Sequence, residues 1–173
     1  RFRNVVTSLQ FERILSASGP TEGHVQRPSD GREPVKIAWL QCVGSRDQNH
    51  AYCSSVCCMY ATKEAVIAKE HAKGIEPHIF LMDMRAFGKG FDSYFERASR
   101  DYGVKYTRCR ISSLAEDPDS HDLLLRYQDA DGALQRERFD LVVLSVGMEI
   151  SESVRALGRR LGVELDEYGF CHT

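Results

Sequence analysis

This sequence of 173 residues predicts an α/β fold with a mostly parallel sheet. Two runs, 35–43 and 140–147, are almost continuously apolar, which is typical of strands buried on both faces of a parallel sheet. Helical stretches lie between the strands, so that strand, helix and strand follow one another as in a βαβ unit. The turn sequence Asp129-Ala-Asp-Gly132 adds a β-hairpin before the last core strand.

The segment before the first core strand predicts a short helix and a linker. Residues 8–18 place their apolar side chains on one face, which favours an amphipathic helix. Residues 19–34 contain repeated glycines and prolines and are expected to form a linker. The strand at 35–43 follows this linker directly.

A long helix is expected after the first core strand. Ser54 or Ser55 is suited to cap its N-terminus, and Gly74 supplies a C-terminal stop. The apolar run 77–83 is then the second core strand. These three elements complete one βαβ unit.

The second half of the chain continues the alternation of strands and helices. We expect a helix at 91–102, a strand at 104–111, a hairpin of 122–127 and 133–139, a strand at 140–147 and a helix at 151–161. The chain starts with Arg1 rather than methionine, and we expect it to be a piece of a longer polypeptide. Its main domain is expected to span 35–150, with flanks at 1–34 and 151–173.

Composition excludes several classes of function. A formal net charge of −2 gives no electrostatic footprint for nucleic acid. No apolar run approaches the roughly 18–20 residues that a membrane helix needs, so we expect no membrane insertion. The six cysteines are clustered rather than spread, which favours a site in a reducing compartment over a disulfide framework. Cytoplasm is therefore the expected location.

Four of the cysteines lie within seventeen residues of each other, at the junction of the first core strand and the long helix. They are Cys42, Cys53, Cys57 and Cys58. Thiolates are soft ligands that suit iron–sulfur clusters, zinc or copper(I), and a cubane cluster usually takes four of them. The lack of a C-x₂-C pair argues against structural zinc. We expect Cys109 and Cys171 to be buried apolar cysteines outside this group.

The same junction would carry a phosphate-binding loop in a dinucleotide-binding fold. Asp83, at the end of the second core strand, has the position of the acidic residue that holds a ribose hydroxyl. The loop 42–47, however, contains a single glycine, Gly44, where several are needed for backbone to approach a pyrophosphate. We therefore do not expect the chain to bind NADH or NADPH with useful affinity.

Several segments of the chain resemble the A subunit of heterodisulfide reductase and its relatives. The resemblance is carried by 36–47, by 52–65 with its Cys-Ser-Ser-Val-Cys-Cys run, by 83–90 and by 140–148. Such subunits are thioredoxin-reductase-like proteins with FAD in one domain. In their other domain, a 4Fe-4S cluster takes the place of the nicotinamide cofactor. The resemblance thus implies a Rossmann-like, three-layer fold, as in the nucleotide-binding domain of pyridine nucleotide-disulfide oxidoreductases.

The resemblance also implies a ligand set and a domain origin. The cluster cysteines of the family carry over onto Cys42, Cys53, Cys57 and Cys58, and Gly44, Ser45 and Arg46 would provide loop amides and positive charge near the sulfurs. Residues 1–34 and 151–173 would be a flank with linker and a return segment of the FAD domain. The FAD-binding glycine motif is absent from this sequence, so FAD is expected in the full-length parent only.

We therefore expect an electron-transfer domain whose 4Fe-4S cluster relays electrons to or from the FAD of its parent chain. Its partners would be that FAD domain and the other subunits of a heterodisulfide-reductase-like complex, and the segment alone is not expected to be catalytic. Two alternatives stay open. One is the NAD(P)H-binding domain of a disulfide oxidoreductase with a redox dithiol, and the other is a cofactor-free module that docks a partner protein of the complex.

Overall fold

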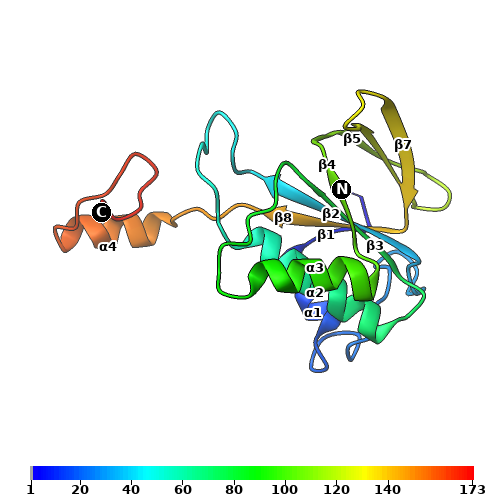
Figure 1. Cartoon of the computed structure of the whole chain (residues 1–173). Helices are drawn as coiled ribbons and strands as arrows, with labels where there is room; N and C mark the ends of the chain where they lie inside the picture. Colours follow the sequence, from blue (N-terminus) through cyan, green and yellow to red (C-terminus); the bar gives the residue numbers. More distant parts are fainter. Residues whose placement is uncertain (1) are drawn as a thin grey trace.

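The computed structural model describes residues 2–173, and a parallel sheet forms its centre (Figure 1). The strands lie in the order β1-β8-β2-β3-β4, and every neighbouring pair is parallel. Their bounds are β1 Val5–Thr7, β2 Lys36–Val43, β3 Glu76–Leu81, β4 Lys105–Arg108 and β8 Leu141–Val146. The continuous hydrophobicity of β2 and β8 reflects their central positions, since apolar residues on both faces of these strands are buried.

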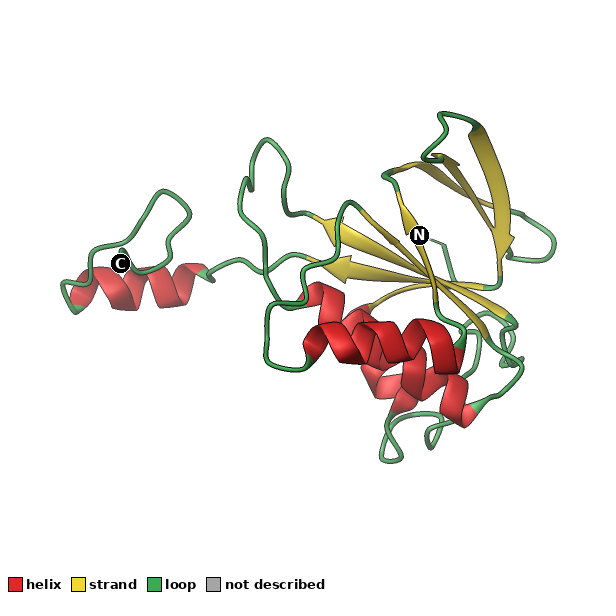
Figure 2. Cartoon of the chain, viewed as in Figure 1, coloured by secondary structure: helices red, strands yellow, loops and turns green. Residues whose placement is uncertain are grey.

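Three helices cover one face of this sheet (Figure 2). They are α1 Ser8–Leu15, α2 Cys57–His71 and α3 Phe91–Tyr102. Small residues on α2, among them Ala61 and Ala65, are fully buried and let the helix approach the sheet closely. They pack in one apolar cluster with Trp39 of β2 and Ile79 of β3.

A second, antiparallel sheet covers the other face. Its strands are β5 Ile111–Glu116, β6 Leu123–Gln128 and β7 Leu134–Phe139, paired in that order. Phe80 of β3 and Phe139 of β7 meet edge to face, with ring centroids 5.7 Å apart. The helices, the parallel sheet and the antiparallel sheet are the three layers of the fold, and the predicted Rossmann-like α/β class is confirmed.

Two details of the elements differ from the sequence-based expectation. The expected strand 104–111 is divided, because β4 ends at Arg108 and Ile111 already belongs to β5 of the second sheet. The expected hairpin is therefore part of a three-stranded sheet. The long helix begins at Cys57 rather than after a serine cap at Ser54 or Ser55, and its N-cap residue is Val56.

The two ends of the chain behave differently in the structure. Strand β1 pairs with β8, and α1 packs into the main core through Phe11, so residues 5–15 belong to this domain. Helix α4, Glu152–Arg160, stands away from the body of the domain (Figure 1). It has no buried residue among those described, and its apolar Val154 and Leu157 are exposed. The assignment of both flanks to an FAD domain stays a prediction.

Strand β2 contains an irregularity just before the cysteine loop. Leu40 pairs with Leu144 of β8, but Val43 pairs with Val146. Strand β2 therefore advances by three residues over a stretch in which β8 advances by two. This is a β-bulge at the end of the strand. Cys42 lies within it and has a left-handed backbone, with φ of 60°.

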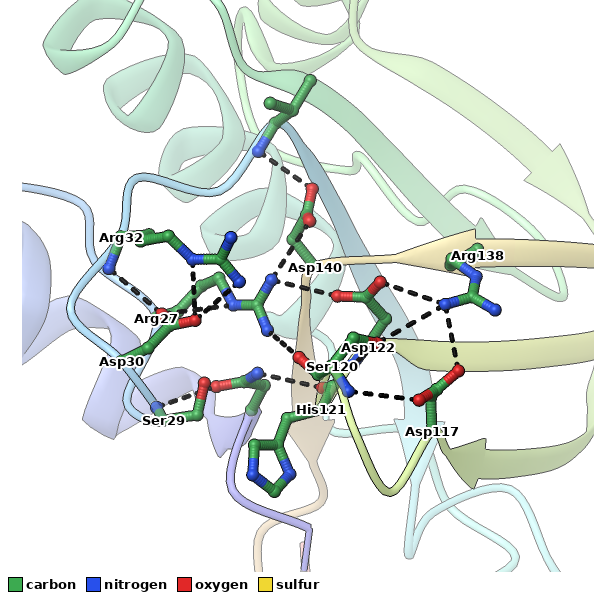
Figure 3. A network of polar contacts seen from close by, with 12 residues as sticks. Arg27, Ser29, Asp30, Arg32, Asp117, Ser120, His121, Asp122, Arg138 and Asp140 are labelled. Atoms are coloured by element: carbon green, nitrogen blue, oxygen red, sulfur yellow. Dashed lines mark hydrogen bonds and ion pairs between the residues drawn. The ribbon is translucent and has the colours of Figure 1, made fainter.

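A buried arginine joins the 19–34 segment to both sheets at the end of β2 opposite the cysteines (Figure 3). The side chain of Arg27 is 4% exposed, and its Nη1 lies 3.0 Å from Asp122 and 3.4 Å from Asp140. Asp140 also accepts hydrogen bonds from the backbone N–H groups of Val35 and Lys36. Arg27 thus connects the start of β6, the start of β8 and the expected linker in one network.

Candidate functional site

The four clustered cysteines lie where β2 ends and α2 begins, at the carboxyl end of the parallel sheet. Cys42 is in β2, Cys53 is in the loop that follows, and Cys57 and Cys58 open α2. Ligands of open α/β sheets bind at this edge, beyond the carboxyl ends of the strands. The fold therefore brings the predicted cysteines to the position where a dinucleotide would otherwise be expected.

The four sulfurs share one electrostatic environment. Burial is the main cause that raises the pKa of Cys58, and the charges of Cys42, Cys57 and Cys53 raise it further. Cys57 and Cys58 are buried, whereas Cys42 and Cys53 are half-buried. All six cysteines within residues 2–173 are free thiols. The four thiols thus lie at one edge of the sheet, close enough for the charge of one to affect Cys58.

The two remaining cysteines lie outside this group. Burial alone raises the pKa of Cys109 to about 11, with no contribution from the clustered thiols. Cys171 is exposed near the C-terminus, beyond α4. The expectation of a buried apolar cysteine is therefore wrong for Cys171, whereas Cys109 is half-buried.

The donor set fits a soft metal centre by its chemistry, but it is not closed into a ligand shell. No group of three or more His, Cys, Asp or Glu side chains in the described part of the chain has the geometry to hold a metal ion. One reason is that Cys57 and Cys58 are consecutive residues of a helix, and such neighbours diverge by about 100°. The ligand assignment of the four cysteines stays a prediction.

The backbone of the site is strained. Cys42, Arg46 and Ser55 all have positive φ, of 60°, 56° and 62°, although none is glycine. A non-glycine residue in this region costs about 1–3 kcal/mol, and such residues concentrate at functional sites. Only two other non-glycine residues in the described range, Glu22 and His121, have positive φ. Strain is thus concentrated at the cysteine loop.

The predicted loop residues Gly44, Ser45 and Arg46 form the turn that leaves β2. Gly44 is left-handed with φ of 70°, and Ser45 is 2% exposed. Gly147, after β8, packs against this turn so closely that a Cβ atom on it would lie 2.5 Å from the carbonyl oxygen of Gly44. The Gly147 N–H also donates to the Val43 carbonyl at 2.7 Å. A glycine after β8 is therefore needed to seat the turn.

Arg46 points toward the end of β3. Its Nη1 and Nη2 donate to the two carboxylate oxygens of Asp83 at 2.5 Å and 3.1 Å, and Arg85 Nε donates to the same carboxylate at 3.2 Å. The hydrogen bond from Arg46 is the main cause that lowers the pKa of Asp83. The residue with the position of a ribose acceptor is therefore paired with two arginines.

Arg46 also acts on the cysteines. Burial raises the pKa of Cys42, and the charge and hydrogen bond of Arg46 oppose that rise. Sequence reasoning expected positive charge near the sulfurs from Arg46, but it did not find the pairing with Asp83. The available signal was topological: both residues follow the ends of adjacent parallel strands, so they meet at the same edge of the sheet.

The rest of the cysteine loop is held by the segment after β8. Tyr52 donates its hydroxyl to the Met148 carbonyl at 2.7 Å. His50 Nε2 lies 3.0 Å from a carboxylate oxygen of Glu149. Ser54, instead of capping α2, accepts a hydrogen bond from the Met148 N–H at 3.2 Å. The loop is thus fixed along its length before it reaches α2.

The N-terminus of α2 lies beside two of the cysteines. Val56 is the N-cap residue and makes no side-chain capping hydrogen bond within the described structure. The first N–H groups of a helix have no partner inside the helix, and with the helix dipole they favour negative charge. Cys57 and Cys58 are the first residues of this helix and lie beside these groups.

Proteins of known sequence resemble the chain over nearly its whole length, although no protein-family model matches it. It is 44% identical over 172 residues to the second iron-sulfur A subunit of CoB–CoM heterodisulfide reductase from Methanopyrus kandleri. It is 43% identical over 172 residues to the A subunit of the H(2)/formate:CoB-CoM heterodisulfide,ferredoxin reductase from Methanococcus maripaludis. Each match covers 98% of this chain and 26% of the relative, so the chain spans about a quarter of their length.

Solved structures share the fold at low sequence identity. L-lysine 6-monooxygenase from Pseudomonas syringae matches with a TM-score of 0.54, covering 96% of this chain and 46% of its own, and LpdA from Mycobacterium tuberculosis with 0.51, covering 88% and 30%. Both are 13% identical, which shows the fold alone. The family comes from the sequence matches: over the segment that it shares with them, this chain belongs to the heterodisulfide reductase A subunits.

Proposed function

We propose that this segment binds a 4Fe-4S cluster through Cys42, Cys53, Cys57 and Cys58, and that it passes electrons to or from the FAD of its parent chain. The observation that carries the proposal is the gathering of these four free thiols at the carboxyl edge of the sheet. The name of the Methanopyrus kandleri relative, an iron-sulfur protein, supports the same cofactor. When bound, such a cluster supplies one-electron transfer.

The residues of this chain have separate tasks in that proposal. The free N–H groups at the start of α2 offset the negative charge of the thiolates. Arg46 adds positive charge beside Cys42. Burial of Cys57 and Cys58 keeps water from the helix side of the site. Hydrogen bonds, charge and burial are the means by which a protein sets the potential of a cluster.

Closing the site requires a change in the first turn of α2. On a regular helix the side chains of Cys57 and Cys58 diverge, so one of them leaves the helical arrangement if both are ligands. The backbone strain at Ser55, just before this turn, marks where the chain departs from regular geometry. The proposal therefore includes an irregular first turn in the loaded protein.

The wider role follows from the names of the relatives. We propose that the parent chain works in a complex of the heterodisulfide reductase type, with FAD bound by another domain. We also propose a cytoplasmic location, which agrees with six free cysteines. None of the helices within residues 2–173 is long and apolar enough to cross a membrane.

The nicotinamide alternative has less support. Both carboxylate oxygens of Asp83 are occupied by Arg46, and the loop after β2 offers Gly44 as its sole glycine. A dinucleotide would have to displace the arginine and to approach a backbone that carries side chains. Measurement of iron and sulfide in the purified protein distinguishes the proposal from the alternative of a cofactor-free docking module.

The test compares the full-length parent chain with a variant of it in which Cys42, Cys53, Cys57 and Cys58 are all serine. Both are purified without oxygen and analysed for iron and acid-labile sulfide. The proposal expects the variant to lack the four irons and four sulfides of one cluster and to lose one electron paramagnetic resonance signal after reduction. Equal iron and sulfide in the two proteins would reject the cluster and favour the docking module.

A further inference from the structure

The outer face of the antiparallel sheet carries exposed arginines. Leu123, Leu125 and Tyr127 of β6 are buried against the parallel sheet, so the alternate residues of this strand point outward. Arg126 is one of these outward residues, and it lies on the middle strand of the sheet. The antiparallel sheet is an outer layer of the molecule, on the side away from the helices (Figure 2). Its outer face is therefore open to contact with another molecule.

Arg126 stands directly opposite a second arginine. The register of β6 and β7 pairs Arg126 with Arg136, and both residues are exposed. Like charges directly opposite each other in an antiparallel pair are destabilising. The third arginine of this face, Arg138, forms ion pairs with Asp117 and Asp122. Within residues 2–173 neither of the other two has such a partner, so two uncompensated cations lie side by side near the middle of the face.

The other outward residues of the sheet add no negative charge. On β5 they include Ser113 and Ala115. On β7, Leu134 lies on the same face as Arg136 and is 86% exposed. The outward positions of the three described strands thus hold no carboxylate, although the whole chain has a formal net charge of −2. Positive charge is concentrated here against the average of the chain.

We propose that this face is a docking surface for an acidic patch on a second protein. Arg126 and Arg136 would bind carboxylates of that patch, because the planar guanidinium matches a carboxylate in two-point hydrogen bonds. A carboxylate between the two arginines would also offset their mutual repulsion. Exposed Leu134 supplies an apolar contact beside them. Arginine is enriched in protein–protein interfaces, and the proposal does not depend on a metal cluster.

The composition of the face favours a separate protein over another domain of the parent chain. Permanent contacts are typically rich in apolar surface. This face instead has a single strongly exposed apolar side chain, Leu134, among charged and polar residues. Such a surface is typical of proteins that associate and dissociate, and its attraction for an acidic partner weakens as salt is added.

The experiment is arginine labelling of the full-length parent chain with phenylglyoxal, followed by mass spectrometry of its peptides. The chain is labelled alone and in the complex with the proteins that co-purify with it at low salt. We expect Arg126 and Arg136 to be labelled in the chain alone, to lose labelling in the complex and to regain it at high salt. Arg100 of α3 is the control, because its side chain is 74% exposed in the helical layer and should be labelled equally in both samples.

A charge reversal separates docking from folding. Arg126→Glu places a carboxylate opposite Arg136 and replaces repulsion by attraction, so the thermal stability of the variant should not fall. The same substitution should reduce the amount of partner protein retained at low salt. Arg100→Glu is the matched control, because it makes the same change of charge on α3 and should leave retention unchanged.

Several results would overturn the proposal. If Arg126 and Arg136 are unlabelled in the chain alone, another domain of the parent covers them. Equal labelling in the two samples, a parent chain that purifies alone at low salt, or equal retention of partner by the two glutamate variants would show that the face docks no protein. Protection that disappears on nuclease treatment would assign the face to nucleic acid instead.

Discussion

Trp39 Nε1 donates a 2.8 Å hydrogen bond to Glu64 Oε2 between β2 and α2, where both side chains are fully buried. The second carboxylate oxygen of Glu64 has no hydrogen-bond partner among the described residues. Burial raises the pKa of Glu64 to about 8, while the hydrogen bond from Trp39 opposes that rise. The core therefore holds Glu64 in its protonated form near neutral pH.

This burial predicts that stability falls as pH rises. The pKa of Glu64 is higher in the folded chain, about 8, than its ordinary value of 4.5, so the folded state holds a proton that the unfolded state releases between these values. Stability from this group is complete below about pH 4.5 and is lost toward pH 8, at up to about 1.4 kcal/mol per pH unit. Glu64→Gln should remove this decline, as measured by urea unfolding at pH 5.5 and 8. Equal slopes in the two proteins would contradict the assignment.

The Arg27 network predicts a large loss of stability on truncation. Arg27→Ala leaves Asp122 and Asp140 without their buried cation, which typically costs about 3–5 kcal/mol. Arg32→Ala is the matched control, since Arg32 pairs with Asp30 from an exposed position and should change stability little. Chemical denaturation of the two variants decides the matter. A loss in Arg27→Ala no larger than that in Arg32→Ala would show that the network does not anchor the fold.

The substitution Gly147→Ala tests whether close packing against Gly147 fixes the position of the turn after β2. In Gly147→Ala the new methyl group would lie 2.5 Å from the Gly44 carbonyl oxygen, so the turn must move, at a cost of about 1–3 kcal/mol. Iron incorporation should fall because Cys42 precedes this turn. Gly74→Ala is the control, because a Cβ there meets no atom of the described structure within 4 Å. Normal iron content in Gly147→Ala would mean that the turn is not part of the site.

Single cysteine replacements test the ligand set. Serine at Cys42, Cys53, Cys57 or Cys58 should abolish or greatly reduce cluster incorporation, because each proposed ligand is a thiolate. Serine at Cys109 or Cys171 should leave iron and sulfide unchanged, since neither lies in the group. All six are compared by metal analysis of protein purified without oxygen. Loss of iron in the Cys109 variant with retention in the Cys58 variant would show that the set is wrong.

Titration with nicotinamide nucleotides tests the prediction that this fold does not bind a dinucleotide at the end of β2. We expect calorimetry to detect no micromolar binding of NADH or NADPH, because the backbone cannot approach a pyrophosphate and Asp83 is already paired. FAD serves as the comparison in the intact polypeptide, where we propose that another domain binds it. A micromolar constant for either nicotinamide nucleotide would return the oxidoreductase alternative to first place.

The sequence was sufficient for the central layer of the fold and for the location of the cysteines. Strands β2 and β8 could be predicted because burial on both faces leaves an almost unbroken apolar run. Strand β1 has only three residues, too few to show a period, and it is defined by its pairing with β8. Strand β5 was merged with β4 because its Ser112 and Ser113 are exposed and give no apolar alternation.

The contacts within the site were less accessible to sequence reasoning. The Arg46–Asp83 pair joins residues that are far apart in the chain, and only the order of the strands brings them together. The start of α2 was misplaced because Ser54, a good capping residue by type, bonds to Met148 of a different segment. In both cases a contact distant in sequence decides between local alternatives that have similar energies.

The bulge in β2 determines which side of the sheet the end of this strand can serve. Trp39 faces the helices and Leu40 faces the antiparallel sheet, so regular alternation would turn residue 42 toward the antiparallel sheet as well. Val43 packs with the antiparallel-sheet cluster instead, which shows that the one extra residue has reversed the parity of the strand. Deleting a single residue between Leu40 and Val43 would remove the bulge and restore the regular alternation of side chains between the two faces of β2. At its present length, a β2 without the bulge would instead turn the Cys42 sulfur toward the antiparallel sheet, into a different layer from α2.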